Sequence, residues 1–185
     1  APFDAAGLSC TSAHVGMAKG TANEPKLLDD LSRVAADMHV IGAGHVICPA
    51  MAPPEDIKIA PNPGEGFRVI SRIVQAMTED HWKRIAHQFS DIGRKMKAEG
   101  LAFGYHNHNF EFVKINGRTG FDIFMAETDP SLVTFELDVG WVAAGGYDPV
   151  ELFNKYPDRY FLMHVKDVKP STQPNIELRM DPTEV

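Results

Sequence analysis

The sequence predicts an α/β fold built as a barrel of parallel strands, and three observations lead to this prediction. Apolar strand-like segments alternate with helical segments five times along the 185 residues, with no hairpin signal between the strands. Such alternation is typical of parallel strands joined by right-handed crossovers. Polar residues stand at the ends of several strands, where barrels and open doubly wound sheets both carry their chemistry. An open nucleotide-binding sheet would also need a glycine-rich phosphate loop after its first strand, and because none is present we favour the barrel.

The first half of the chain is predicted to combine two strands, three helices and one long loop. In order, we expect a short strand within 7–16 that enters a loop with His14 at its end, a helix that starts at 23–25 and is closed by Gly42 and Gly44, a strand over 45–48, a loop over 51–66 and helices over 67–77 and 78–100. The last of these helices is the best defined, because Thr78 is a good N-cap residue, acidic residues follow it and Gly100 is a typical stop. The loop is rich in proline and glycine, and its sequence indicates no particular role.

The second half of the chain repeats the alternation. In order, we expect a strand over 101–108, a turn at Asn116-Gly117, a helix over 121–125, a strand over 133–139, a glycine-rich loop over 140–146, a short helix beginning at Asp148-Pro149 and a strand over 160–168. Residues 169–185 are predicted to be irregular. Strand segments such as VICPA and YFLMHV are apolar on both faces, which fits a parallel sheet covered on both sides.

Composition and charge exclude several classes of function. The net charge of −7 and the lack of a basic run argue against a nucleic-acid surface. No apolar run is long enough to span a bilayer, and the first residues show no signal peptide. We therefore expect a cytoplasmic protein, or a periplasmic one if a signal peptide has been removed. Cys10 and Cys48 are too few for a disulfide framework and are predicted to be buried free thiols.

The last predicted strand separates an apolar face from a polar one, because residues two apart on a strand point to the same side. Phe161, Met163 and Val165 share the apolar face and are expected to meet helices. His164 and Lys166 share the opposite face, which we expect to point to the barrel axis near its mouth.

The same alternation brings a carboxylate and two histidines to other strand ends. In VTFELDV, Asp138 shares the predicted axial face with Glu136. In LAFGYHNHNFEF, His106 and His108 share a face. Glu111 has the opposite parity and reaches the axis only if the chain bulges or turns after the histidines, so which of these three groups reaches the mouth stays open.

Carboxylate and imidazole groups from successive strands suit a divalent ion such as Mn²⁺, Zn²⁺, Co²⁺ or Mg²⁺. Such an ion would polarise a substrate carbonyl and stabilise an enediolate while a nearby carboxylate or imidazole moves protons. A lone inward histidine is more often a core residue, but the coincidence of three strand ends favours a metal or substrate role. Lys166 either contacts the substrate or pairs with Glu136 or Asp138, and His14 is a weaker candidate for the pocket lining.

Three motifs, YHNHNFEF, FELDVGW with AAGGYDP after it, and MHVKD, resemble the xylose isomerase-like barrel superfamily and, within it, the sugar phosphate isomerase/epimerase branch. The resemblance covers residues 7–167. It implies a (β/α)8 TIM barrel whose divalent metal is held by Glu, Asp, His and a final Glu. The resemblance implies that Asp138 and His164 occupy the Asp and His ligand positions of the metal site. Glu111 takes the first Glu position, where His106 or His108 could stand instead.

Barrels of this family have eight strands and about 250 residues, whereas only five strands are predicted here. Relative to that pattern, two opening strands and the final Glu ligand are missing. We therefore expect residues 1–185 to form a single, partial TIM-barrel domain, and we expect this stretch by itself to have little or no turnover.

The resemblance implies a sugar isomerase or epimerase that transfers a proton next to a carbonyl of a small-molecule sugar or keto-sugar. The expected residues are Glu111, Asp138 and His164 for the metal, Glu111, His108 and Lys166 for catalysis, and His14, His106 and Trp141 for substrate binding. A keto-sugar lyase, dehydratase or 3-keto-glycoside hydrolase, and a non-catalytic sugar-binding barrel, are the alternatives. Endonuclease action on abasic DNA also occurs on this barrel, but the acidic charge disfavours it. No membrane partner is expected, and homo-oligomerisation stays open.

Overall fold

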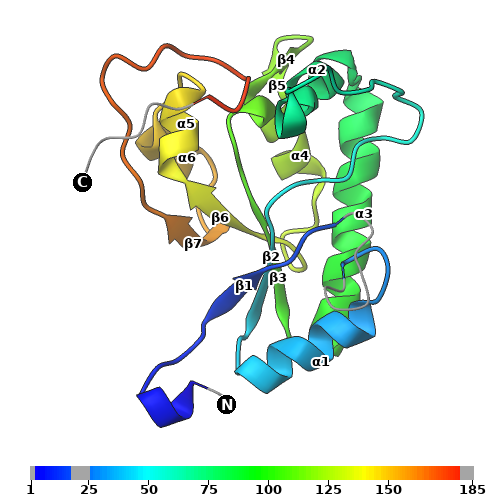
Figure 1. The fold of residues 1–185 in the computed structure, drawn as a ribbon, viewed down its shortest axis with the longest axis vertical. Helices are drawn as coiled ribbons and strands as arrows, with labels where there is room; N and C mark the ends of the chain where they lie inside the picture. The colour runs from blue at the N-terminus through cyan, green and yellow to red at the C-terminus, as the bar shows by residue number, and fades with distance from the viewer. Residues whose placement is uncertain (1–2, 18–25, 180–185) are drawn as a thin grey trace. The chain divides into compact units, whose positions relative to one another are not determined.

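The computed structural model describes residues 3–17 and 26–179, which form two compact units (Figure 1). The first unit takes its residues from Ala1–Ala52, His87–His106 and Thr128–Thr134, and the second from Pro53–Ala86, Asn107–Glu127 and Phe135–Val185. The predicted helix start at 23–25 lies outside the described residues.

The first unit contains three parallel strands, β1 (Ser12–His14), β2 (His45–Cys48) and β3 (Ala102–His106), which run side by side in Figure 1. A short 3-10 helix, η1 (Asp4–Ala6), precedes them. Thr134, the first residue of a later strand, also belongs to this unit, and its Oγ1 donates to the carbonyl of Phe103 at 3.2 Å.

Helix α1 (Leu31–Ile41) connects β1 and β2. It begins at Leu31 because the side chain of Asp30 accepts a hydrogen bond from the backbone N–H of Arg33, and it ends at Gly42, whose φ of 75° is left-handed. Within the described residues this helix begins later than predicted, and its end at Gly42 confirms the predicted stop.

The core of the first unit lies between β3 and the last part of α3 (Glu79–Ala98). Phe89 of α3 is fully buried, and its ring lies 5.5 Å from the ring of Phe103 and 5.4 Å from that of Tyr105. Burying each such side chain contributes about 1.5–3 kcal/mol. A Cβ at Gly104 would lie 2.9 Å from both Ile47 Cδ1 and Thr134 Oγ1, so a side chain there would require these neighbours to move.

The second unit holds most of the remaining elements. In chain order these are η2 (Gly66–Arg68), α2 (Val69–Ala76), the start of α3, η3 (Phe110–Phe112), β4 (Lys114–Ile115), β5 (Arg118–Thr119), α4 (Gly120–Glu127), β6 (Thr134–Asp138), α5 (Val139–Ala144), α6 (Pro149–Lys155) and β7 (Tyr160–His164). Strands β6 and β7 are parallel, and their register pairs Asp138 with His164. The ladder shifts between Phe135 and Glu136.

These elements confirm the predicted fold class. The pairings of β1 with β2, β2 with β3 and β6 with β7 are parallel. Helices separate these strands along the chain, as they do in a TIM barrel. The described residues contain five such strands, so the α/β barrel is incomplete. None of the described helices is both long and apolar enough to cross a membrane.

Two local predictions in the second unit were wrong. The glycine-rich segment 140–146 was predicted to be a loop, but its first part is α5, because Asp138 caps the helix and the apolar run after it favours helical packing. We also found no hairpin signal between the strands, whereas β4 and β5 form a small antiparallel hairpin around the predicted turn, which is confirmed. Asn116 (φ 50°) and Gly117 (φ 85°) form its turn, and two positive φ angles match the strand twist.

The apolar face of β7 was predicted to meet helices, and this was wrong for the part of the chain that the structure describes. Phe161, Met163 and Val165 are 65%, 52% and 71% exposed. The matching face of β6 behaves as expected, since Phe135 and Leu137 are buried. Tyr160 at the start of β7 does pack against Phe153 of α6, with ring centroids 4.9 Å apart, so the misprediction concerns the three exposed residues.

The two cysteines are free thiols, as predicted, but only Cys48 is fully buried, and Cys10 is half-buried. Burial raises the pKa of the Cys48 thiol to about 12. Cys48 therefore stays protonated and behaves as a small apolar side chain.

Candidate metal centre

Asp138, the last residue of β6, is the centre of a polar cluster in the second unit and is 0% exposed. One carboxylate oxygen, Oδ1, accepts a hydrogen bond of 2.8 Å from the backbone N–H of Trp141 and so caps α5. The other, Oδ2, lies 2.9 Å from His164 Nδ1 and 2.9 Å from Lys166 Nζ. A buried carboxylate is thus held by a helix cap on one side and by two nitrogen groups on the other.

His164 and Lys166 reach Asp138 from the end of β7. His164 is the last residue of this strand and stands opposite Asp138 in the register, with 44% of its side chain exposed. Lys166 follows two residues later, and its Nζ also lies 5.3 Å from the ring centroid of Trp141. The predicted pairing of Lys166 with Asp138 is confirmed, and its contact with a substrate stays a prediction.

Gly140 makes room for Lys166. A Cβ at Gly140 would lie 2.3 Å from Lys166 Cγ, closer than side-chain atoms can approach. The lysine stem therefore passes directly over the first turn of α5, and this position brings its ammonium group to Asp138.

Asn107 fixes the backbone of Asp138, a role that was not predicted from the sequence. Its Oδ1 accepts a hydrogen bond of 2.9 Å from the N–H of Asp138, and its Nδ2 donates to the carbonyl of Asp138 at 3.4 Å. Asn107 is 1% exposed. Asn107 stands between His106 and His108, the two residues predicted to face the barrel axis. Strand alternation predicted that Asn107 points the opposite way.

The prediction that His106 and His108 share one strand face was wrong, because β3 ends at His106. The chain then turns into η3, which contains Glu111. The strand alternation that placed Glu111 on the opposite face therefore does not continue to this residue. Both carboxylate oxygens of Glu111 accept from the backbone N–H of His108, at 3.0 and 2.9 Å, and Glu111 is 0% exposed. The ring of His108 stacks on Phe110 and lies 5.5 Å from the ring of Trp141.

The first unit has its own histidine pair. His14 is the last residue of β1 and His106 is the last residue of β3. Their ring centroids lie 4.9 Å apart, and each offers a ligand nitrogen within 4.8 Å of the other.

The cluster around Asp138 fits a divalent cation. Asp138 and His164 offer a carboxylate oxygen and an imidazole nitrogen within 4.8 Å of each other, which is the mixed oxygen and nitrogen donor set of many Mn²⁺, Zn²⁺ and Co²⁺ sites. The ammonium group of Lys166 stands beside Asp138 Oδ2, so this position already favours positive charge.

Parallel strands with helices between them, several of which end in histidine or aspartate, fit an α/β barrel with its chemistry at the strand ends. The chain belongs to the xylose isomerase-like TIM barrel family, whose family model matches residues 3–184. This is a family of enzymes of sugar metabolism, as the relatives below illustrate.

Three relatives show how far the similarity extends. The inosose dehydratase of Lacticaseibacillus casei is 34% identical over 92 residues, which are 50% of this chain and 30% of that protein. The inosose dehydratase of Geobacillus kaustophilus is 33% identical over 98 residues, 53% of this chain and 31% of that protein. A sugar phosphate isomerase/epimerase from Parabacteroides distasonis superposes with a TM-score of 0.69 at 31% identity, over 95% of this chain and 64% of that one. The chain thus spans less than two thirds of each of these relatives.

Proposed function

We propose that the full-length protein is a divalent-metal-dependent enzyme that moves a proton next to the carbonyl of a sugar or keto-sugar, as an isomerase or epimerase. The observation that carries this proposal is the cluster at the ends of β6 and β7, where Asp138 Oδ2 lies 2.9 Å from both His164 Nδ1 and Lys166 Nζ. A buried acid, an imidazole and an ammonium group supply the ligands and charges that enolate chemistry needs.

Asp138 and His164 are the proposed metal ligands of the second unit. A further ligand is proposed from the HNHNFE segment, with Glu111 and His106 as the candidates. Glu111 offers a buried carboxylate. His106 is the last residue of β3, just as Asp138 and His164 are the last residues of β6 and β7. When bound, a divalent ion would polarise the substrate carbonyl and stabilise the negative charge that develops on its oxygen.

The protein's own side chains are proposed to position the substrate and move the proton. Lys166 is held by Asp138 and the Trp141 ring, so its ammonium group can donate to a substrate oxygen without losing its place. His108 lies against Trp141 and is the proposed proton-transfer group, since histidine is the commonest general acid–base residue. Trp141 offers an aromatic face to the sugar, and His14 and His106 are proposed to bind its hydroxyl groups.

A dehydratase is the second candidate, and the 34% identity to an inosose dehydratase favours it. Both reactions begin with removal of the proton next to the carbonyl. In the isomerase or epimerase the proton returns to the substrate, whereas in the dehydratase a neighbouring hydroxyl group leaves as water.

Product analysis separates these functions. The full-length protein with Mn²⁺ would be incubated in D₂O with a panel of ketoses, inososes and 3-keto-glycosides, and the products followed by NMR. We expect metal-dependent deuterium incorporation with formation of an isomer or epimer. Loss of water from an inosose would establish the dehydratase instead. Sugar binding with neither exchange nor product, in the presence of every metal tested, would contradict both and favour a non-catalytic binding barrel.

A further inference from the structure

A polar cavity lies in the second unit, partly lined by the loop for which the sequence indicated no role. Its volume is about 340 Å³, which is at the lower end of the range for small-molecule sites. Its lining residues include Glu65, Arg68 and Arg72 on one side, and Glu177 and Arg179 on the other. The first group belongs to η2 and α2 with the loop before them, and the second to the irregular segment after β7.

Three arginines and two glutamates give this cavity one excess positive charge in a chain whose net charge is −7. Arg72 is paired with Glu65 at 3.0 Å, and Glu65 also accepts from the backbone N–H of Asn62 at 2.6 Å. Arg68 has no carboxylate partner in residues 3–17 and 26–179, and its guanidinium group makes only a long contact of 3.4 Å with the carbonyl of Gly64. The unpaired charge is therefore that of Arg68.

Arg179 is paired weakly. Its Nε lies 3.3 Å from Glu177 Oε2, and the two side chains are 66% and 51% exposed. An exposed pair of this kind contributes only about 0–1 kcal/mol. An anion that enters the cavity can therefore replace Glu177 as the partner of Arg179 at little cost.

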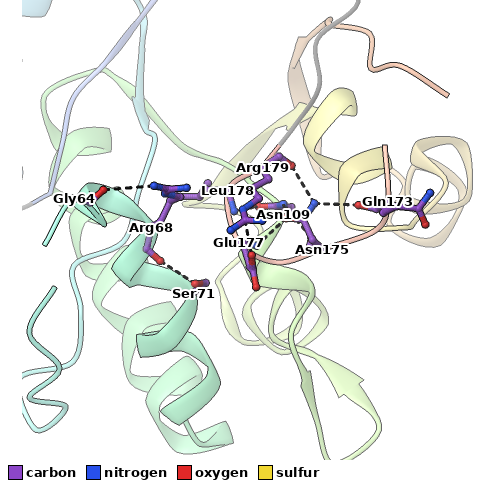
Figure 2. Close-up of polar contacts among 9 residues, drawn as sticks. All are labelled: Gly64, Arg68, Ser71, Asn109, Gln173, Asn175, Glu177, Leu178 and Arg179. Carbon is purple, nitrogen blue, oxygen red and sulfur yellow. Dashed lines mark hydrogen bonds and ion pairs between the residues drawn. The ribbon is translucent and has the colours of Figure 1, made fainter. Parts of the chain in front are cut away.

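The segment that carries Glu177 and Arg179 is nevertheless fixed in place, as Figure 2 shows. Asn109, which is 0% exposed, donates from Nδ2 to the carbonyl and to Oδ1 of Asn175, both at 3.0 Å. Its Oδ1 accepts from the N–H of Leu178 at 3.2 Å. Asn175 Nδ2 in turn donates to the carbonyl of Arg179 at 3.1 Å. A buried amide thus holds the second wall of the cavity from within the fold.

We propose that this cavity binds a phosphoryl group, through Arg68 and Arg179, with Arg72 fixed beside them. The planar guanidinium fork matches the oxygens of a phosphate and binds them with charge-assisted hydrogen bonds. The volume leaves space for a small body attached to the phosphate, so a sugar phosphate or free inorganic phosphate are the two sources of this chemistry. The proposal is independent of the reaction proposed above, since it concerns binding only.

Calorimetric titration of the full-length protein in the presence of EDTA tests the proposal, because a chelator removes binding of phosphate to any metal. The ligands are inorganic phosphate, a hexose phosphate and the unphosphorylated hexose. We expect phosphate and hexose phosphate to bind and the plain hexose not to bind at this site. Tighter binding of the ester identifies a sugar phosphate as the source, and equal binding identifies free phosphate.

Three variants locate the binding. Arg68→Ala should weaken phosphate binding about tenfold or more, because it removes the unpaired guanidinium group. Glu177→Gln should strengthen it by about two- to fivefold, because it removes the carboxylate that competes for Arg179. Arg94→Ala is the matched control, since Arg94 is an exposed arginine paired with Asp91 at 2.6 Å outside the cavity, and it should change nothing. The proposal is overturned if the wild type does not bind phosphate, or if Arg68→Ala and Glu177→Gln both leave the affinity unchanged.

Discussion

Two aspartates of the second unit, the fully buried Asp138 and the partly buried Asp122, have similar partners and different surroundings. Asp138 Oδ2 lies 2.9 Å from Lys166 Nζ, and Asp122 Oδ1 lies 2.8 Å from Lys155 Nζ. The third group differs, because Asp138 faces the imidazole of His164, whereas Asp122 accepts from the hydroxyl of Tyr156 at 2.6 Å. A carboxylate–lysine pair is therefore common to both clusters and is no evidence of a functional site.

The surroundings give each cluster its role. Asp122 lies on α4 and its partners come from α6, so the cluster joins two helices. Burial, and after it the hydrogen bond to Asp122, raise the pKa of Tyr156 far above its usual value, so this hydroxyl group keeps its proton. Asp138 stands at a strand end beside an imidazole that can ligate a metal or move a proton. Position in the barrel and an imidazole partner are what distinguish the candidate centre.

The largest expected effect comes from Asp138→Asn. The amide keeps the shape of the side chain and removes the charge that holds His164 and Lys166. We expect kcat/KM of the full-length protein for its sugar substrate to fall by about 10³-fold or more. Asp122→Asn is the matched control and should leave kcat/KM within about twofold of the wild type. Equal losses in the two variants would remove the distinction between the clusters.

Replacing the two lysines sharpens the comparison further. Lys166→Met keeps the stem that packs on Gly140 and removes the ammonium group, so turnover should fall by about 10²-fold. Binding of Mn²⁺ should be retained or tighter, because the ammonium group no longer competes at Asp138 Oδ2. Lys155→Met should affect neither quantity. Loss of Mn²⁺ binding in Lys166→Met would mean that the lysine holds the centre together and has no separate role.

The fit between Gly140 and Lys166 predicts a smaller effect. In Gly140→Ala the new Cβ would lie 2.3 Å from Lys166 Cγ, so the lysine must move away from Asp138. We expect the free energy of unfolding to fall by about 1–3 kcal/mol and kcat to fall by about tenfold. Gly44→Ala is a suitable control, since nothing lies within 4 Å of a Cβ there. Chemical denaturation and steady-state kinetics measure the two quantities, and an unchanged kcat would show that Lys166 need not hold its observed position.

The smallest effect is a pH-dependent loss of stability in Asp122→Asn. Burial raises the pKa of Asp122, but the hydrogen bonds from Lys155, Tyr156 and Thr119 outweigh it and hold the pKa below its usual value. The folded state therefore gains stability above the unfolded pKa of about 3.9 and loses it as the pH falls through the folded value. At pH 7 the variant should be less stable by about 1–3 kcal/mol, and the difference should shrink below about pH 4. Urea denaturation at pH 7 and pH 3 tests this, and a constant difference would contradict it.

The fold was largely predictable because its signals are local. The strand over 45–48 and the helix after Thr78 matched the structure closely, since apolar periodicity and capping residues act within a few positions. The segment 140–146 was mispredicted because its glycines suggested a loop, while Asp138 was considered only as a ligand and not as the N-cap that starts α5.

The candidate centre was predictable only in part. Strand parity identified Asp138, His164 and Lys166, whose proximity follows from the register of two parallel strands. Parity failed for His108 and Glu111, because it holds only while the strand continues and β3 ends at His106. The roles of Asn107 and Asn109 depend on contacts with residues 31 to 69 positions away, for which the sequence contains no local signal.

The most direct test of the central claim is a titration of the full-length protein with Mn²⁺, followed by electron paramagnetic resonance. The account predicts one bound ion per chain in the wild type, with nitrogen coupling from imidazole that decreases in His164→Gln. It predicts loss of the site in Asp138→Asn and full retention in Asp122→Asn. Unchanged Mn²⁺ binding in Asp138→Asn would show that this carboxylate is not a metal ligand and would contradict the account.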